Sequence, residues 1–315
     1  MDPDSHVATA RPEDRESALR LVFLHFKPGE RDKRVANALH LMEAGNLDPD
    51  GLFVAREGER VSGAMICLPI PGASALVWPP RTRPMARAAS VEDALVGRAA
   101  SWLRQRGAKL GQALLAPDEV QFAKPLERNG FRNVTTLCYL RRSADQPLER
   151  SGRSHLDWRP YESRDRALFA QTLLRTYEGT RDCPEVNGIR TIDEILDGHA
   201  ADAGRNYEHW CLAYEGPRPV GVLLMTESAE WQAWELAYVG VVPEARGRGI
   251  GRELVCRALA EARAAETTQL TLCVDSRNAP ALTLYRSLRF ERYDERAVFL
   301  AVWCEIGAGN RPRTN

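Results

Sequence analysis

Apolar and polar positions in the C-terminal half of the chain alternate between strand-like runs and helix-like stretches. Thr191 and Glu194 have the spacing of a capping box, which predicts the start of a helix. Leu168, Leu173 and Leu174 recur near helical spacing and predict the apolar side of an earlier helix. The predicted strands span 210–214, 220–226, 234–242, 269–274 and 296–303, and the predicted helices include 164–177, 252–265 and 279–288. This alternation predicts an α/β sheet with helices on its faces.

The N-terminal half repeats the same plan. Two strand-like runs flank Glu57-Gly58-Glu59, a helix is expected at 91–106 with Ser90 and Asp93 as its cap, and a last strand is expected at 134–140. Polar residues containing Pro147 and Gly152 then predict a linker. The predicted organisation is therefore a first domain at 1–142, a linker at 143–154, a second domain at 155–305 and a disordered tail at 306–315.

Composition narrows the class of protein. The chain has 315 residues, enough for two domains, with 44% hydrophobic and 27% charged residues, as in soluble globular proteins. A formal net charge of +0 provides no case for a nucleic-acid or membrane partner, and no apolar run approaches the length of a spanning helix. The first residues lack the pattern of a signal peptide. Seven scattered cysteines without a Cys-x-x-Cys pair argue against a metal site and favour the cytoplasm.

The most informative segment is a glycine-rich turn at Val241–Gly251, between a predicted strand and a predicted helix. Glycine lets backbone N–H groups approach a ligand closely, and a helix N-terminus adds unpaired donors and partial positive charge. The turn therefore predicts a diphosphate-binding site. The P-loop pattern is absent, and Gly247, Gly249 and Gly251 do not have the spacing of the dinucleotide-binding fingerprint.

The pattern Arg246-x-x-Gly249-x-Gly251 after Val-Val-Pro resembles the coenzyme A signature of the GCN5-related N-acetyltransferases, the GNAT family. The downstream segment from Asp275 to Phe290 is similar to the second signature of that family. The resemblance covers Trp158 to about Cys304. It implies two tandem GNAT-like domains, each a mixed, mostly antiparallel sheet flanked by helices, as in mycothiol synthase-like acetyltransferases. It also implies acetyl-CoA as cosubstrate.

The resemblance to the GNAT family implies roles for individual residues. Backbone N–H groups of Val241 and Val242 are expected at the acyl end of coenzyme A, and those from Gly247 through Arg252 at its diphosphate. Asn278 either binds the pantetheine arm or caps a helix. Arg289 occupies the place of the family's usual glycine. The expected cofactor-binding residues are Val241, Val242, Arg246, Gly247, Arg248, Gly249, Ile250, Gly251, Arg252 and Asn278.

Transfer from a thioester to an amine needs a group that removes a proton from the amine and a group that protonates the leaving thiolate. Glu235 lies eleven residues before Arg246, where the resemblance implies the catalytic base, and strand alternation predicts that it shares a face with Ala237, Val239 and Val241. An ion pair to a neighbouring arginine is the structural alternative.

Tyr285 matches the family's usual general acid, with a buried packing role as its alternative. The acceptor is expected near the polar loop after the first helix of the second domain. Candidates are Tyr177, Glu178, Arg181 and Asp182, with loop capping as the alternative. His199, Glu208 and His209 lie nearby in sequence, and Trp231 and Trp234 either line a pocket or fill the core.

The N-terminal half lacks the features of the cofactor loop. Aligning Pro80 with Pro243 aligns Arg83 with Arg246, and Ala86 and Ala88 then replace the two glycines, with Pro84 inside the turn. The position of Tyr285 falls on Leu126. We therefore expect a degenerate first domain that binds no coenzyme A.

The expected activity is acetyl-CoA-dependent N-acetylation of the primary amine of a small molecule, by direct attack in a ternary complex, in a monomer or homodimer. A protein or peptide acceptor and a non-catalytic acyl-CoA-binding module are the alternatives. The presence of both Glu235 and Tyr285 favours an enzyme, because sensing a ligand does not need an acid and a base.

Overall fold

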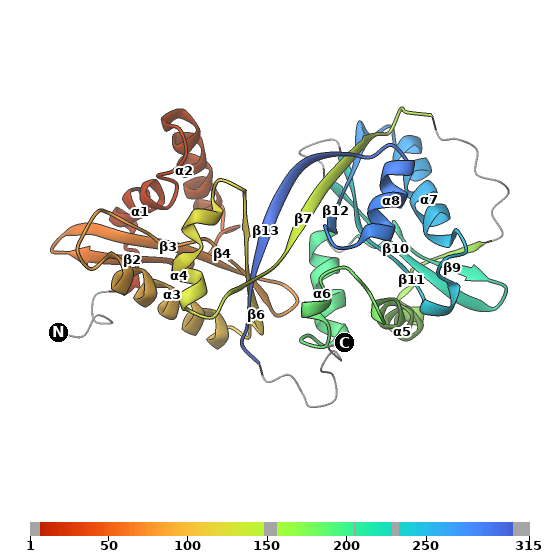
Figure 1. Cartoon of the computed structure of the whole chain (residues 1–315), viewed down its shortest axis with the longest axis horizontal. Helices are drawn as coiled ribbons and strands as arrows, with labels where there is room; N and C mark the ends of the chain where they lie inside the picture. The colour runs from red at the N-terminus through yellow and green to blue at the C-terminus, as the bar shows by residue number, and fades with distance from the viewer. Residues whose placement is uncertain (1–6, 148–155, 205, 229–232, 305–315) are drawn as a thin grey trace. The chain divides into compact units, whose positions relative to one another are not determined.

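The computed structural model describes residues 7–147, 156–204, 206–228 and 233–304. The chain divides into two compact units, one made of the residues up to Val134 together with those from Ala297, and the other of Thr135–Arg296. Each unit is a β-sheet with helices packed on it (Figure 1). Most of the predicted linker, the predicted tail and Trp231 lie outside the described residues.

The first unit has a sheet in the order β1-β2-β3-β4-β6-β13, and β5 pairs with β3. Neighbouring strands are antiparallel except β4 and β6, which are parallel. Its elements are β1 (Val7–Thr9), α1 (Arg15–Val22), α2 (Pro28–Glu43), β2 (Leu52–Glu57), β3 (Arg60–Ile70), β4 (Ser74–Val77), β5 (Arg81–Thr82), α3 (Ala88–Gln105), β6 (Leu110–Leu115), α4 (Lys124–Arg128) and the C-terminal part of β13 (Glu291–Val302).

The second unit has a sheet in the order β7-β12-β11-β10-β9-β8, again with one parallel pair, β11 and β12. Its elements are most of β7 (Arg132–Ser143), β8 (Asp157–Pro160), α5 (Arg166–Tyr177), α6 (Ile192–Asp202), β9 (Trp210–Glu215), β10 (Arg218–Ser228), β11 (Ala233–Val241), α7 (Ile250–Ala264), β12 (Gln269–Asp275) and α8 (Ala279–Ser287). The order of strands and helices repeats that of the first unit. The predicted tandem α/β architecture is therefore confirmed.

The last strand of each half belongs to the sheet of the other unit. β7 follows α4 in the chain, yet its residues from Leu137 to Ser143 pair with β12. β13 follows α8, yet its residues from Ala297 to Val302 pair with β6. The units therefore differ from the predicted limits at 142 and 155. The alternation of apolar residues shows that a strand is buried but does not name its partner, so the sequence could not reveal this exchange.

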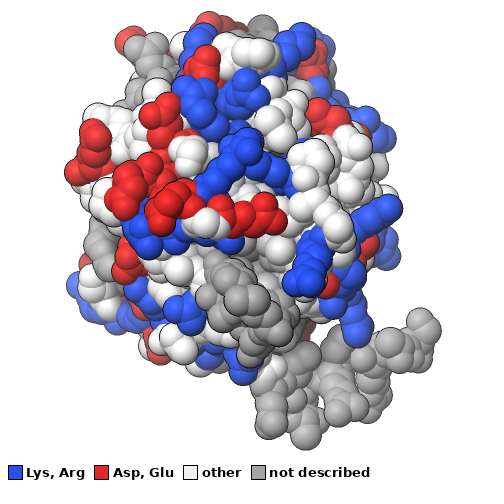
Figure 2. All heavy atoms as spheres, turned by 90° about the vertical axis from the view of Figure 1, so that its left-hand side faces the viewer, with Lys and Arg blue, Asp and Glu red and all other residues white. Residues whose placement is uncertain are grey.

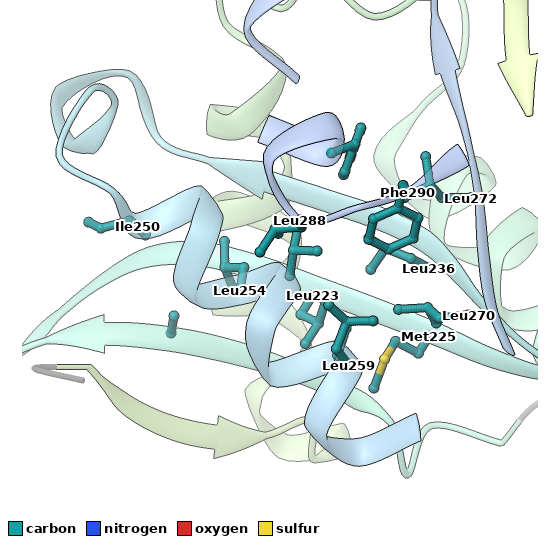
Figure 3. Close-up of a cluster of buried hydrophobic side chains, with 14 of the residues drawn as sticks. Leu223, Met225, Leu236, Ile250, Leu254, Leu259, Leu270, Leu272, Leu288 and Phe290 are labelled. Carbon is teal, nitrogen blue, oxygen red and sulfur yellow. The ribbon is translucent and has the colours of Figure 1, made fainter. Parts of the chain in front are cut away.

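The core of the second unit forms where α7 packs on the sheet. Leu254 and Leu259 of α7 meet Leu223 and Leu270 of the strands and Phe290, as Figure 3 shows. The buried residues of α7 recur at helical spacing, as predicted for this helix. Helices α5 and α6 bury their own apolar residues in a second cluster that includes Trp210 of β9. The sheet therefore has a packed cluster against each helix group.

The apolar side of α5 differs from the prediction. Leu173 is fully buried, but Leu168 and Leu174 are 38% and 44% exposed. The buried side instead contains Phe169 and Thr176, which lie a helical repeat from Leu173. Thr172 and Thr176 can also be buried on this side, because each hydroxyl donates to a carbonyl of the preceding turn, as Thr176 Oγ1 does to Leu173 O at 2.6 Å.

Of the two predicted helix caps, the structure contains one and lacks the other. The capping box of α6 is confirmed, because Glu194 N donates to Thr191 Oγ1 at 3.2 Å and Thr191 N donates to Glu194 Oε2 at 2.7 Å. The predicted cap of α3 is wrong, since this helix begins at Ala88 and Ser90 lies inside it. Asp93 instead accepts hydrogen bonds from Arg128 Nε at 2.8 Å and from Asn129, which tie α3 to the end of α4.

The surface on the side of the first unit carries both signs of charge next to one another (Figure 2). Ion pairs on α1 and α2 include Arg20 with Glu16 and Asp32, and Arg34 with Glu30. All seven cysteines are free thiols. Among the described helices, none has the length and apolar character needed to cross a bilayer.

Candidate active site

A cleft of about 420 Å³ opens in the second unit where two parallel strands separate. β11 and β12 pair only from Ala233–Glu235 to Gln269–Thr271, and beyond these residues the two strands diverge. The cleft is lined by the second half of β11, by Cys273 of β12, by the start of α8 and by the loop after α5. The separation exposes backbone N–H and C=O groups of β11 that would otherwise pair with β12.

A β-bulge in β11 changes which face Glu235 occupies. Tyr238 pairs with Leu224 but Leu236 pairs with Met225, so Ala237 is the extra residue. Leu236 therefore packs in the same cluster as Val239, on the α7 side, whereas Ala237 and Tyr238 pack on the α5 side. The prediction that Glu235 shares the face of Val239 and Val241 is wrong, because simple alternation fails across a bulge. Glu235 is exposed on the opposite face.

The hydrogen-bond pattern of β11 decides which of its amides face the cleft. Val242 N donates to Val220 O at 3.1 Å, so this N–H is used by β10 and is not available to a ligand. The expectation for the Val242 amide is therefore wrong. Because successive amides of a strand point to opposite sides, the N–H groups of Val239 and Val241 point toward the side from which β12 has separated. Val239 was missed in the sequence, although it lies two residues before Val241.

The glycine-rich turn has the geometry that the sequence predicts. Gly247 and Gly249 have left-handed φ values of +73° and +85°, which L side chains adopt rarely. A Cβ at either glycine would meet nothing within 4 Å, so open space lies beside the turn. Gly249 is the N-cap residue of α7 and provides no side-chain cap. The first amides of the helix, including those of Ile250 and Gly251, have no intrahelical acceptor, and this donor set fits a diphosphate.

Three arginines of the turn use their side chains to hold it in place. Arg246 donates from Nε to Val241 O and from Nη2 to Thr176 O, both at 3.0 Å. Arg252 Nη1 donates to Ser287 Oγ at 2.9 Å, and Arg248 pairs with Glu215 at the end of β9. The side chains therefore attach the turn to neighbouring elements, which leaves the backbone to face a ligand.

Tyr285 lies in α8 with its ring buried against Phe290, and it lines the cleft. Burial raises the pKa of the Tyr285 hydroxyl above its usual value, and the nearby Asp182 and Cys273 contribute in the same direction. The hydroxyl therefore stays protonated at neutral pH, as a proton donor requires. Asn278 Oδ1 accepts from Ala281 N at 3.3 Å, so the capping role of Asn278 is present while its side chain also lines the cleft.

The structure brings two of the four predicted acceptor-loop residues to the cleft. Arg181 and Asp182 line it. Tyr177 instead packs edge-on against Tyr238 with ring centroids 5.4 Å apart, and burial raises its pKa to about 12. Glu178 follows the end of α5, is exposed and does not line the cleft.

Asp182 is the carboxylate of this loop whose environment is most unusual. It is an exposed residue at the rim, but its carboxylate lies among protein atoms, and this loss of hydration raises its pKa to about 6. Asp182 Oδ1 accepts a hydrogen bond from Asp275 N at 3.1 Å. Burial would also raise the pKa of Asp275, but hydrogen bonds from Arg277 and Thr135 outweigh it, and that pKa falls to about 2. Asp275 Oδ2 accepts from Cys183 N at 3.0 Å and so anchors the loop to β12.

Replacing Asp182 with asparagine is expected to make stability less dependent on pH. The folded state holds the Asp182 proton more tightly than the unfolded chain, whose aspartates titrate near 3.9, so the native protein loses stability as pH rises from about 4 to about 6. Asparagine keeps the acceptor oxygen but cannot ionise. The melting temperature of the variant should match that of the native protein at pH 4 and exceed it at pH 7. A constant difference across this range would contradict the raised pKa.

Other polar residues noted in the sequence have structural contacts. Burial lowers the pKa of His199 to about 4, and its ring lies 5.9 Å from that of Tyr238. His209 Nε2 lies 2.8 Å from Glu227 Oε1. The ring centroids of His209 and Trp234 are 4.2 Å apart, and Trp234 is buried in the core. Glu208 N donates to Asn206 Oδ1 in the turn before β9.

The exchanged strand β7 adds residues that no sequence signal placed at the site. Tyr139 of β7 pairs directly with Cys273 of β12. Two pairs further along, Arg141 pairs with Thr271, which in turn pairs with Glu235. Directly paired residues share a face of the sheet, so Tyr139 and Arg141 lie on the face that carries Glu235.

The model of the "Acetyltransferase (GNAT) family" matches residues 173–290, which include the cleft, the glycine-rich turn and Tyr285. Residues 173–290 belong to the GNAT family. A mycothiol acetyltransferase of Gordonia bronchialis is 31% identical over an alignment of 136 residues that covers 38% of this chain and 44% of that protein. One from Segniliparus rotundus is 27% identical over an alignment of 185 residues that covers 52% of this chain and 63% of that protein. The chain thus matches about half the length of these relatives.

Solved structures support a tandem GNAT fold for the whole chain. A GCN5-related N-acetyltransferase from Sphaerobacter thermophilus has a TM-score of 0.60 at 20% identity, covering 94% of this chain and 95% of that one. A tandem GNAT protein from the clavulanic acid biosynthesis pathway has a TM-score of 0.52 at 16% identity, covering 94% and 97%. At these identities the likeness concerns the fold alone.

The GNAT-like first unit lacks the glycine turn. Arg83 Nε donates to Val61 O at 3.0 Å, and α3 begins at Ala88 after an N-cap at Arg87. Leu126, which takes the place of Tyr285, is fully buried. That this unit binds no coenzyme A stays a prediction.

Proposed function

We propose that the protein is an acetyl-CoA-dependent N-acetyltransferase that acts on the primary amine of a small molecule. One arrangement carries the proposal: the strands β11 and β12 diverge over a cleft that holds Tyr285 at one side and leads to the turn Gly247–Gly251 at the other. A thioester bound with its diphosphate at the turn and its pantetheine arm along the amides of Val239 and Val241 would reach Tyr285.

The cleft, the glycine-rich turn beside it and Glu235, which does not line the cleft, supply distinct parts of the proposed reaction. The turn amides hold the diphosphate, and the β11 amides orient the thioester. Glu235 removes a proton from the amine, through water, while the amine attacks the thioester carbon. Tyr285 gives its proton to the sulfur as the carbon–sulfur bond breaks. The Tyr285 hydroxyl is protonated at neutral pH and can serve as the donor, and burial makes it a weaker acid than a free tyrosine because its pKa is raised.

A small-molecule acceptor agrees with the relatives that are named mycothiol acetyltransferases. A polar acceptor agrees with Arg181 and Asp182 at the rim of the cleft. We place the reaction in the cytoplasm, a reducing compartment that keeps seven free thiols reduced.

A screen of amines tests the proposal by measuring the free thiol released from acetyl-CoA. Release that depends on a small primary amine supports it. Release with peptides alone would indicate a protein acceptor. Tight binding of acetyl-CoA without release for any amine would indicate a binding module and contradict an enzymatic function.

Replacing Tyr285 with phenylalanine is expected to lower kcat by about 10–10³-fold, a smaller effect than the usual contribution of about 10²–10⁴-fold from general-acid catalysis, because a thiolate leaves readily even without an acid. The ring contact with Phe290 is retained, so the fold should persist. Steady-state kinetics should show little change in KM for acetyl-CoA. A thioester with a more acidic thiol should reduce the difference. If only KM rises, the hydroxyl binds the cosubstrate and does not protonate it.

A further inference from the structure

A second cavity of the second unit, of about 340 Å³, lies near the start of β12. The active-site cleft lies near the other end of that strand, at Cys273 and Asn278, and the two cavities share no lining residue. The end of β7, the start of β12 and the turn between α8 and β13 form its walls. Its described lining residues include three arginines, Arg141, Arg142 and Arg289, and one carboxylate residue, Glu291. Among these residues the cations outnumber the anion.

Arg142 is a buried cation in this wall, with only 3% of its surface exposed. Its Nη2 donates to the carbonyl oxygens of Gln146 at 3.1 Å and Pro147 at 3.0 Å. Its Nε and Nη1 are buried and have no hydrogen-bond partner in the described part of the chain. Burial lowers the pKa of Arg142, and the charge of Arg289 also lowers it, so the two guanidinium groups repel one another. Buried donors without acceptors are costly, particularly when they are charged.

Arg289 has an unfavourable backbone conformation at the same cavity. Its φ of +63° is left-handed, which disfavours residues other than glycine, and the GNAT resemblance expects glycine at this position. Strained conformations of this kind concentrate at functional sites. The strain at Arg289 and the unpaired donors of Arg142 are two independent costs in one cavity, and an anion would offset both by bonding to the two guanidinium groups.

We propose that this cavity binds a small tetrahedral oxyanion, such as a phosphate group, between Arg142 and Arg289. The planar guanidinium forks suit two-point bonding to oxyanions, and the Ser143 hydroxyl and the Gln269 amide are further polar groups in the wall. The site is separate from the proposed transferase cleft and does not depend on the proposed function.

A purely structural role for Arg142 is the competing explanation, because its bonds to Gln146 and Pro147 hold the segment after β7. That role uses Nη2 and leaves Nε and Nη1 unexplained. The two explanations differ in their response to an added anion.

Thermal unfolding of the full chain tests the site, with inorganic phosphate replacing chloride at constant ionic strength. Phosphate should raise the melting temperature of the native protein in a saturable manner. Arg289→Gly should unfold at a higher temperature without phosphate, because glycine removes the strain, and should bind phosphate at least about 10-fold more weakly because a two-point contact is lost. Arg142→Gln should abolish the response. Arg164→Gln, a change in an exposed side chain, should keep it.

The glycine-rich turn is a second place where phosphate could bind, so the titration is repeated in Gly249→Asp, which places a carboxylate at the turn. A response that persists there supports the new site, and one that disappears assigns phosphate to the turn and overturns the proposal. Equal responses in the native protein and Arg289→Gly would also overturn it, as would no response beyond that of chloride. If Arg142→Gln fails to fold, Arg289→Gly still decides the outcome.

Discussion

Replacing Glu235 with glutamine is expected to lower the rate of acyl transfer by about 10²–10⁴-fold, the usual contribution of a general base. Glutamine keeps the size of the side chain and removes its basicity. The affinity for acetyl-CoA, measured by calorimetry, should be nearly unchanged, because Glu235 lies on the opposite face of β11 from Val239 and Val241. Raising the pH should recover part of the loss, because more of the amine is then neutral.

Two matched variants make this test specific. Glu227→Gln removes a carboxylate from the neighbouring strand β10, where Glu227 contacts His209, and should leave the rate unchanged. Asp182→Asn removes the other carboxylate of interest, whose pKa of about 6 would also suit a base. A native rate in Glu235→Gln, together with a large loss in Asp182→Asn, would transfer the role of base to Asp182.

Replacing Gly249 with aspartate is expected to weaken acetyl-CoA binding by about 10²-fold. Two like charges about 4 Å apart repel by about 4 kcal/mol at an effective dielectric constant of about 20, or about 10³ in affinity, and solvent screening reduces this value. Open space beside Gly249 allows the side chain to enter the region where the diphosphate is expected. Calorimetric titration of the native protein and the variant measures the difference.

Gly249→Asn is the matched control, because asparagine has nearly the same shape and also tolerates the left-handed φ of +85°. It should bind acetyl-CoA much more tightly than the aspartate variant does. Equal affinities of the native and aspartate proteins would contradict a diphosphate site at this turn. The native titration should give one site per chain, because Pro84, Ala86 and Ala88 replace the turn in the first unit. Two sites of similar affinity would contradict this assignment.

Local sequence patterns predicted most elements of the second unit well. Residues 234–242 were predicted as a strand and are found as β11 (Ala233–Val241). The helix predicted at 252–265 is α7 (Ile250–Ala264). These two predictions, and that of the capping box of α6, were correct because each pattern determines backbone conformation through residues close together in the chain. In the first unit, α1 and α2 were missed: α1 is only 8 residues long, and α2 has a weaker separation of apolar from polar residues.

Such patterns could not predict which distant parts of the chain would be in contact. The bulge at Ala237 reversed the expected face of Glu235, and its cause lies in the pairing of β11 with β10. The hydrogen bond from Val242 N to Val220 O removed an expected ligand contact for the same reason. Tyr139 reached the face of Glu235 only because β7 pairs with β12.

By itself, the sequence determined the two α/β repeats, the loss of the glycine turn in the first, and the candidate diphosphate turn and proton donor in the second, because each depends on residues close together in the chain. Only the tertiary structure decided which sheet each final strand completes, which amides of β11 face the cleft, and that Arg142 and Arg289 meet in a second cavity. The exchanged strands and the second cavity depend on partners more than a hundred residues away, and the β11 amides depend on β10 and β12. A pattern of buried positions shows that a side chain is covered but does not show which residues cover it.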